Sequence, residues 1–178
     1  MLRDPQCATI VRQAQESDHA ALCRLWAEGD ALHARLRPDF FRVAAGMPRS
    51  RRFLIQALAA RQEVVLLAAV GDAPELAGLI HVRIYDTPVE PTKVPRTRGH
   101  VEEMVVAQAC RRKGVGRELM QEAVRWCREQ GASQLLLTVW AGNRPAEAFY
   151  ADLGFQPVSQ VLGLELTGEP VAASPPRR

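Results

Sequence analysis

A strand that runs through a basic, glycine-bearing turn directly into a helix is the feature that most restricts how this chain can fold. Residues 99–107 have strand character, the turn at 111–116 contains Gly114 and Gly116, and apolar periodicity predicts a following helix of about 17 residues. A helix N-terminus presents unpaired backbone N–H groups and a partial positive charge, and glycine lets an anion approach that backbone. Four basic side chains surround the turn: Arg111, Arg112, Lys113 and Arg117. The pattern predicts a diphosphate held mainly by main-chain amides.

Two better-known phosphate motifs fit this turn less well. Its spacing is Arg-x-x-Gly-x-Gly, whereas dinucleotide-binding folds use Gly-x-Gly-x-x-Gly and P-loops use Gly-x-x-x-x-Gly-Lys-Ser/Thr. The turn also follows an antiparallel hairpin instead of opening a strand–helix–strand unit. From the turn alone, a glycine-capped helix in a basic surface loop, without any ligand, stays open as the alternative.

The rest of the chain predicts a mixed α/β sheet of the α+β type. Periodicity, turn residues and caps predict the other elements in this order: a strand at 8–12, a helix from Ser17 to about Gly29, a helix after Pro48, paired strands at 63–70 and 75–85 with a bulge at Gly78, a proline-rich loop at 86–98, a strand at 134–140, a helix at 143–153, and a last strand or pair of strands at 155–166. We expect a single domain at 8–166, a flexible N-terminus at 1–7 and a disordered tail at 167–178.

Length and composition exclude several classes of protein. With 178 residues, 47% of them apolar, the chain is long enough to bury a core without a metal or disulfide. A net charge of +3 is too small to indicate a nucleic-acid partner, and no apolar run is long enough to span a membrane. The N-terminus lacks the apolar stretch of a signal peptide. We therefore expect a cytoplasmic protein with no metal, whose cysteines are reduced: Cys7, Cys23, Cys110 and Cys127.

A second motif begins at Asn143. This residue suits a helix N-cap, Pro145 suits the first helical turn, and Gly154 suits the position just past the helix end. Phe149 gives the helix a buried edge, and Tyr150 suits either the core or a functional site. By itself the pattern is a weak signal.

Together, the two motifs resemble the GNAT superfamily of acyl-CoA N-acyltransferases. The turn resembles the family's pyrophosphate-binding motif, Gln/Arg-x-x-Gly-x-Gly/Ala, at Arg111, Gly114 and Gly116. The later segment resembles its Asn-x-x-Ala-x-x-Phe-Tyr-x-x-x-Gly-Phe motif, matched by Asn143, Ala146, Phe149, Tyr150, Gly154 and Phe155. The resemblance spans residues 8–166, is strongest at 98–157, and implies an N-acetyltransferase that uses acetyl-CoA as a co-substrate.

The resemblance also implies where the co-substrate binds. The sheet would be mostly antiparallel, with central strands that splay apart to admit the pantetheine arm. The main chain of three strand residues would pair with the pantetheine as an added strand does: Met104, Val105 and Val106. The turn would wrap the pyrophosphate through Arg112, Lys113, Gly114, Val115, Gly116 and Arg117. Asn143 would contact the pantetheine and Ala146 would lie against the co-substrate. Arg112 stands where the family often has glycine, so its side chain is expected to point outward, toward the 3′-phosphate.

Acetyl transfer to an amine needs a base and an acid. An alkyl amine has a reference pKa near 10.4, so about one molecule in two thousand is neutral at pH 7. Glu102 and Glu103 are the candidate bases, acting directly or through one water, and strand alternation predicts that they point to opposite faces. The family's carboxylate aligns with Glu102, which we favour over Glu103. Tyr150 is the expected acid for the departing sulfur, and no covalent intermediate is required.

The acceptor is less constrained. In the family, the first helices and the loop before the fourth strand form the acceptor wall, and here these contain Trp26, His33, Phe40, Phe41, Tyr85 and the basic stretch Lys93–Arg98. Packing in the core is the alternative for each aromatic ring. We expect a small amine, an amino acid or a peptide N-terminus as acceptor, with no nucleic-acid or membrane partner. The family is consistent with a homodimer through the last strands. A catalytically silent acyl-CoA sensor is the alternative function.

Overall fold

The structure, a computed structural model, describes residues 8–43, 46, 49–70, 75–88, 90–164 and 166. The chain divides into two compact units, with the boundary after Arg144. The first unit holds the sheet and helices α1 to α3, and the second holds most of helix α4 and the residues after it. The segments expected to be a flexible N-terminus (1–7) and a disordered tail (167–178) lie outside the described residues.

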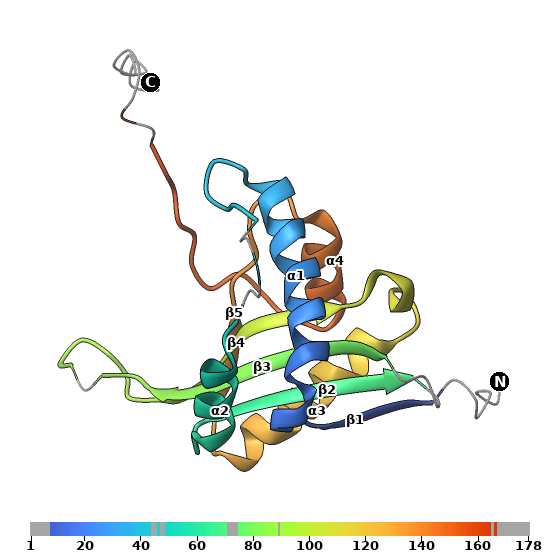
Figure 1. Cartoon of the computed structure of the whole chain (residues 1–178). Coiled ribbons are helices and arrows are strands. Elements are labelled where there is room, and N and C mark those ends of the chain that lie inside the picture. The colour runs from blue at the N-terminus through green and yellow to red at the C-terminus, as the bar shows by residue number, and fades with distance from the viewer. Residues whose placement is uncertain are drawn as a thin grey trace. The chain divides into compact units, whose positions relative to one another are not determined.

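The first unit contains a sheet with the strand order β1-β2-β3-β4-β5 (Figure 1). The strands are β1 (Thr9–Gln13), β2 (Glu63–Val70), β3 (Leu76–Asp86), β4 (Thr97–Val106) and β5 (Gln134–Leu137). Neighbours from β1 to β4 pair antiparallel, whereas β4 and β5 pair in parallel. The predicted mixed, mostly antiparallel sheet is confirmed.

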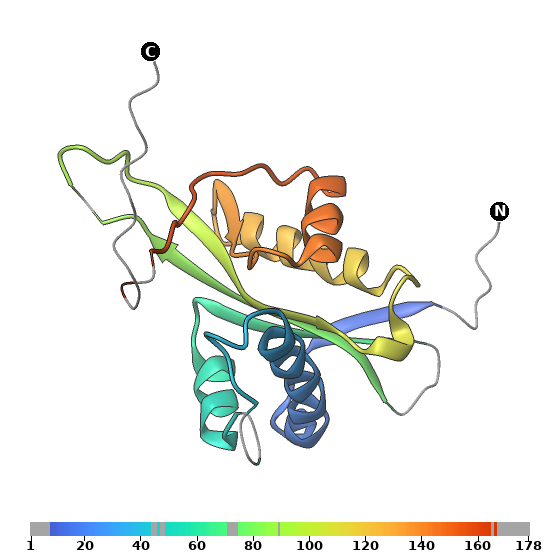
Figure 2. The ribbon, with the colours of Figure 1, turned by 90° about the horizontal axis from the view of Figure 1, so that it is seen from above.

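Helices cover both faces of this sheet (Figure 2). Helices α1 (His19–Leu36) and α2 (Arg51–Ala59) lie on one face, and α3 (Val115–Glu129) lies on the other. The core under α1 and α2 includes Leu22, Trp26, Leu54, Val65, Leu67 and Leu79. Apolar spacing predicts a buried stripe of Val115, Leu119, Ala123, Trp126 and Cys127 on helix α3. All of these are buried except Trp126, which is half-buried, and Met120 is buried as well.

Helix α1 is longer than the sequence predicts. Ser17, the expected N-cap, lies inside a 3-10 turn (Glu16–Asp18), and the α-helix that follows passes Gly29 and ends at Leu36. Glycine at position 29 serves close packing: a Cβ there would lie 2.9 Å from Cγ2 of Val105 in β4. The missing side chain that suggested a helix end therefore lets α1 approach the sheet.

In the second unit, backbone hydrogen bonds around a glycine cap the C-terminal end of the helix. Helix α4 (Arg144–Asp152) ends before Gly154, which has a φ of +89°, as predicted. The Phe155 N–H donates to the Tyr150 carbonyl at 3.0 Å and the Gly154 N–H donates to the Ala151 carbonyl at 2.9 Å. These are the two bonds of a Schellman motif, and the apolar contact that accompanies such a motif is here between Tyr150 and Phe155, whose ring centroids are 5.6 Å apart.

The predicted last strand is wrong for the residues described. Residues 155–164 and 166 contain no strand. Their large apolar side chains are exposed, with Val161 at 95%, and include Val158, Leu162, Leu164 and Leu166. An alternating apolar pattern forms a strand when a neighbouring strand satisfies its backbone and covers one face, and the sequence of the segment itself supplies neither.

Candidate functional site

Strands β4 and β5, the last two in the order of the sheet, part midway along β4. Their ladder runs from Arg98↔Gln134 to Val101↔Leu137 and ends there, while β4 continues to Val106. On its other side β4 stays paired with β3 up to Val106↔Gly78. The predicted splaying of the central strands is confirmed, and the backbone of 102–106 borders the opening.

The bordering part of β4 is held from two sides by glycines. Gly29 of α1 lies against the Val105 side chain, as described above. On β3, a Cβ at Gly78 would lie 2.8 Å from the carbonyl oxygen of Val105. The predicted irregularity at Gly78 is present as well, since the β2–β3 register shifts between Ala68↔Gly78 and Ala69↔Leu76. Two missing side chains thus set the position of the strand that borders the opening.

A bulge in β4 changes where the two candidate carboxylates point. On β3, His81 pairs with Glu103 but Val82 pairs with Val101, so Glu102 is the extra residue. Glu103 therefore lies opposite His81, on the face covered by α1 and α2, and Glu102 contacts His100, which lies on that same face. The expectation that alternation sends them to opposite faces is wrong, because a bulge interrupts the alternation.

The two carboxylates nevertheless differ in their partners. Glu103 forms an ion pair with Arg49, which also reaches Asp30 of α1 at 3.4 Å, and its Oε2 is buried. Glu102 is more exposed, and the Nδ1 of His100 lies 3.2 Å from its Oε1. The charge of Glu103 is already balanced by a guanidinium, whereas Glu102 is open to solvent beside a titratable ring.

The basic turn leads from β4 into α3 as predicted. Arg111 anchors it, because its Nε donates to the Val106 carbonyl at 3.0 Å. Arg112 has a φ of +63° and Gly114 a φ of +89°, and alternating conformations of this kind form anion-binding concavities of backbone N–H groups. Gly114 is the N-cap of α3 and has no side chain that could cap the first N–H groups. Arg112, Lys113 and Arg117 are exposed around this turn.

In the second unit, Tyr150 is held among aromatic rings. Its ring centroid lies 5.2 Å from that of Phe149, in addition to the Phe155 contact. Burial raises the pKa of the Tyr150 phenol above its usual value, so the hydroxyl stays protonated at neutral pH. The other residues predicted for the second motif lie near the start of α4: the Asn143 N–H donates to the Trp140 carbonyl at 3.1 Å, and Ala146 is in the first turn.

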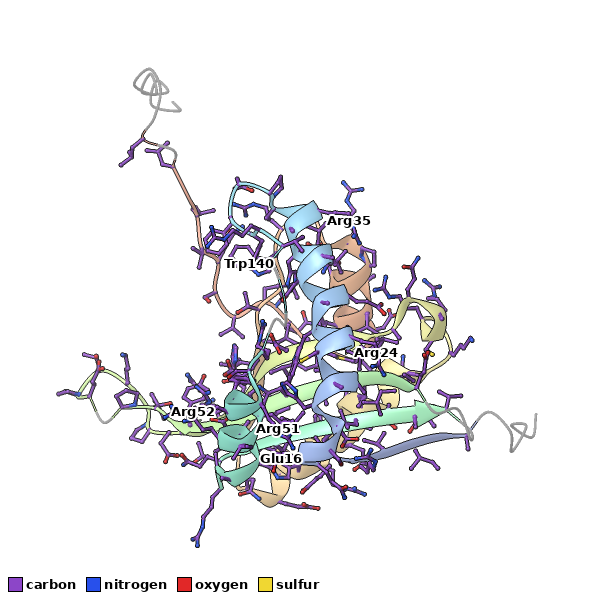
Figure 3. The ribbon with its side chains drawn as sticks, in the orientation of Figure 1. Glu16, Arg24, Arg35, Arg51, Arg52 and Trp140 are labelled. Carbon is purple, nitrogen blue, oxygen red and sulfur yellow. The ribbon has the colours of Figure 1, made fainter. Side chains whose placement is uncertain are left out.

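Part of the expected acceptor wall forms an aromatic cluster. The sequence predicts three of its members but not Trp140. His33 stacks on Phe41 with centroids 5.1 Å apart, and both Phe40 and Phe41 contact Trp140, at 4.7 Å and 4.8 Å. Trp140, just beyond β5, lies beside the segment that follows α1 (Figure 3). Its position directly after a strand bordering the opening is the signal that could have found it. Trp26 is 1% exposed, so of the two alternatives for this ring the structure has packing in the core.

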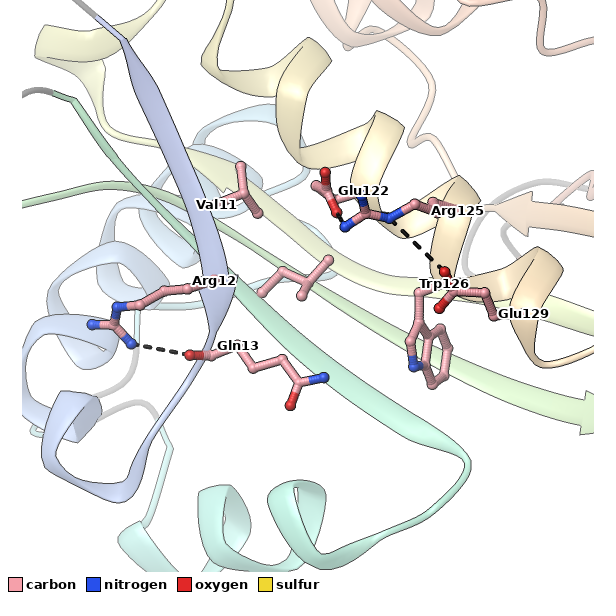
Figure 4. A pocket seen from close by; sticks show the side chains of 8 residues that line it. Val11, Arg12, Gln13, Glu122, Arg125, Trp126 and Glu129 are labelled. Carbon is pink, nitrogen blue, oxygen red and sulfur yellow. Dashed lines mark hydrogen bonds and ion pairs between the residues drawn. The ribbon is translucent and has the colours of Figure 1, made fainter.

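A hollow of about 150 Å³ lies elsewhere in the first unit (Figure 4). Its lining comes from β1, β2 and α3: Val11, Arg12, Gln13, Leu66, Glu122, Arg125, Trp126 and Glu129. It contains none of the predicted site residues. In the described part of the chain, no helix is long and apolar enough to cross a membrane, and no group of three His, Cys, Asp or Glu side chains could hold a metal.

Comparison with known families agrees with the geometry of the opening and the turn. Residues 29–155 match the family described as "Acetyltransferase (GNAT) family". This is more than half of the 178 residues, so the chain belongs to the acetyltransferase (GNAT) family, and the resemblance drawn from the two motifs is confirmed.

Two curated relatives match shorter stretches. The uncharacterized N-acetyltransferase YobR of Bacillus subtilis is 32% identical over 62 residues, which are 35% of this chain and 25% of the relative. The streptothricin acetyltransferase of Streptomyces lavendulae is 44% identical over 55 residues, which are 31% of this chain and 29% of the relative. The chain thus spans between a quarter and a third of the length of these relatives.

Solved structures share the fold over most of the chain. A variant of the BH1408 protein from Bacillus halodurans has a TM-score of 0.83 at 24% identity, covering 88% of this chain and 99% of that one. The aminoglycoside 6′-N-acetyltransferase AAC(6′)-Ih from Acinetobacter baumannii has a TM-score of 0.64 at 17% identity, covering 89% and 97%. AAC(6′)-Iy, in complex with the bisubstrate analog CoA-S-monomethyl-acetylneamine, has a TM-score of 0.64 at 18% identity, with coverage of 89% and 97%.

Proposed function

We propose that this protein is an acetyl-CoA-dependent N-acetyltransferase that moves the acetyl group directly to a primary amine, without a covalent intermediate. The domain responsible spans 8–166, and the acceptor is a small amine, an amino acid or a peptide N-terminus. The observation that carries the proposal is the course of β4, which borders the opening and then leads through the basic turn into the N-terminus of α3. Relatives named as acetyltransferases of streptothricin and aminoglycosides favour a small-molecule amine.

The residues present fit acetyl-CoA, which supplies the acetyl group as an activated thioester. Its pantetheine would pair with the main chain of Met104, Val105 and Val106, and its pyrophosphate would be held by Arg112, Lys113, Gly114, Val115, Gly116 and Arg117. Asn143 would contact the pantetheine, and Ala146 would lie against the co-substrate. Arg111 contributes by holding the turn to the Val106 carbonyl.

Two side chains carry the chemistry. Glu102 draws the proton from the acceptor ammonium, and this role is supported by the exposure of its carboxylate at the bulge of β4, beside His100. Tyr150 donates its hydroxyl proton to the departing sulfur, and its raised pKa keeps that proton in place until it is needed. The thiols play no part in this scheme, and burial raises the pKa of Cys127 to about 11.

The location and assembly form part of the proposal. We place the protein in the cytoplasm, without nucleic-acid or membrane partners. The exposed apolar side chains that follow Gly154 support a homodimer joined through that segment. Light scattering at several protein concentrations would measure the mass, and a monomer at all of them would contradict this part.

The proposal is tested by thiol release from acetyl-CoA with a panel of amines: streptothricin, an aminoglycoside, lysine, a peptide with a free α-amine, and 2-phenylethylamine. We expect release that depends on the amine. Tight acetyl-CoA binding without turnover for any amine would favour the silent sensor. Absence of acetyl-CoA binding would overturn the proposal together with the residue roles.

Replacing Arg112 with glycine separates its backbone from its side chain. Because a non-glycine residue in the left-handed region costs about 1 kcal/mol, we expect Arg112→Gly to keep or raise the melting temperature. Loss of the guanidinium should raise the KM for acetyl-CoA about tenfold and leave the KM for 3′-dephospho-acetyl-CoA unchanged. Arg112→Ala keeps the backbone strain and should show the same change in KM. Equal effects on both co-substrates would contradict the 3′-phosphate contact.

Removing the phenolic hydroxyl should lower the rate without changing its pH dependence. We expect Tyr150→Phe to reduce kcat by about 10²-fold. Because the pKa of Tyr150 is raised above its usual value, the hydroxyl is protonated throughout a profile from pH 6 to 9, so the loss should be uniform. Phe149→Leu is the matched control for packing. A shift of the alkaline limb in Tyr150→Phe would contradict this role.

A further inference from the structure

The exposed carboxylate of the bulge has an imidazole beside it. The His100 and Glu102 side chains are 30% and 33% exposed, and Nδ1 lies 3.2 Å from Oε1. His100 pairs with Leu136 of β5, one step before the ladder ends at Val101↔Leu137. The pair therefore lies where β4 and β5 part, within reach of solvent.

Several other charged groups on this face are engaged with one another, whereas the buried Nε of Arg98 has no hydrogen-bond partner among the described residues. Arg83, opposite His100 on β3, donates its Nε to Glu63 at 3.0 Å, and Glu63 also contacts His81 Nε2 at 2.9 Å. The charged and titratable groups that the sheet and the adjoining helices place around the pair are Glu63, His81, Arg83, Arg98, Glu103, Arg49 and Asp30. Of these, Glu63 pairs with Arg83 and Glu103 pairs with Arg49, while the His100 ring contacts Glu102.

We propose that His100 and Glu102 act as one base, in which Glu102 fixes the Nδ1–H tautomer of His100 and Nε2 accepts the proton of the acceptor ammonium. A carboxylate only accepts hydrogen bonds, so the contact requires the hydrogen on Nδ1 and leaves the lone pair on Nε2. Histidine is also the side chain that most often serves as a general base in proteins, so the ring suits this role. The inference rests on the proposed function and moves the proton-accepting atom from the Glu102 carboxylate to Nε2 of His100, with Glu102 orienting the ring.

The protons of the transfer balance with this assignment. The ammonium gives one proton to Nε2, and the resulting imidazolium is stabilised by Glu102. The neutral amine attacks the thioester carbonyl, so that a C–N bond forms and the C–S bond breaks. Tyr150 gives its hydroxyl proton to the departing thiolate, and the second proton of the nitrogen then passes to the Tyr150 oxygen and restores the hydroxyl. The imidazolium returns its proton to water, so one proton is released per acetyl group.

Chemical rescue separates a base from a structural histidine. In the thiol-release assay, with the panel amine that turns over fastest, we expect His100→Ala to lose about 10²-fold in kcat at pH 7 and to regain about tenfold with added imidazole. The matched control is His19→Ala, which removes a half-buried imidazole that contacts Arg49 and Cys23, and it should leave kcat unchanged. A folded His100→Ala variant with normal kcat, or with no response to imidazole, would overturn the proposal.

A second measurement does not depend on the acceptor. In protein with 15N-labelled histidine, the ring nitrogen shifts report the tautomer, and we expect His100 in the Nδ1–H form. Glu102→Leu should convert it to the Nε2–H form commoner in free imidazoles and leave His19 unchanged. An Nε2–H tautomer of His100 in the unaltered protein would overturn the pairing. If no panel amine is acetylated, the proposed function fails, while the tautomer still decides whether the pair exists.

Discussion

Replacing Glu102 with glutamine is expected to lower kcat by about 10² to 10⁴-fold, with little change in melting temperature. Glutamine keeps the shape of the side chain but cannot hold the negative charge toward which the ammonium proton moves. The side chain is exposed at a strand bulge, so its replacement leaves the core intact. Thiol release from acetyl-CoA, measured over pH 6 to 9 together with thermal unfolding, checks both parts.

The neighbouring carboxylate provides the comparison. Glu103→Gln removes a half-buried partner of Arg49, so we expect it to lower the free energy of unfolding by about 1–2 kcal/mol. Its kcat should fall far less than that of Glu102→Gln. If the effects are reversed, with kcat lost in Glu103→Gln and kept in Glu102→Gln, then Glu103 and not Glu102 is the base.

Adding one methyl group at Gly78 is expected to disturb the sheet where β4 borders the opening. A Cβ at this position would lie 2.8 Å from the Val105 carbonyl oxygen and 3.1 Å from Leu119 Cδ1, and a backbone atom cannot move aside as a flexible side chain can. We expect Gly78→Ala to cost about 3 kcal/mol, which lowers the melting temperature by roughly 6–12 °C. Calorimetry measures the shift directly.

The same substitution also tests the link between this contact and co-substrate binding. The strain pushes the Val105 main chain, so we expect the KM for acetyl-CoA to rise in any Gly78→Ala protein that stays folded. Gly163→Ala is the control, because a Cβ there meets no atom within 4 Å, and the change should be within about 0.5 kcal/mol. An unaltered KM in folded Gly78→Ala would mean that Val105 does not position the co-substrate.

The basic turn and helix α3, which follows it, could be predicted from the sequence because their signals are local. Gly114 adopts the positive φ that glycine favours. Val115 begins helix α3, whose apolar residues recur at helical spacing. The same holds for Gly154, which ends α4 by its own backbone conformation. Each signal lies within a few residues of the feature that it determines.

The arrangement around the carboxylates could not be predicted in this way. Nothing in Val101, Glu102 and Glu103 marks one of them as the extra residue of a bulge, because the register is set by how β3 pairs with β4. The predicted helix end at Gly29 is wrong for a similar reason, since the residue that requires glycine there, Val105, is far away in the chain. Features that depend on residues brought together by folding have no signal in the neighbouring sequence.

The early end of the β5 ladder has a consequence for solubility. It leaves one side of residues 102–106 unpaired among the described strands, and an unpaired strand edge is a template for any extended chain, including an aggregating one. Three features disfavour pairing of this edge with another strand. The bulge at Glu102 bends it, Arg111 donates to the Val106 carbonyl at its end, and the cationic turn follows directly. An edge that is short, kinked and positively charged at its end favours a short, extended, anionic ligand over the strand of another protein.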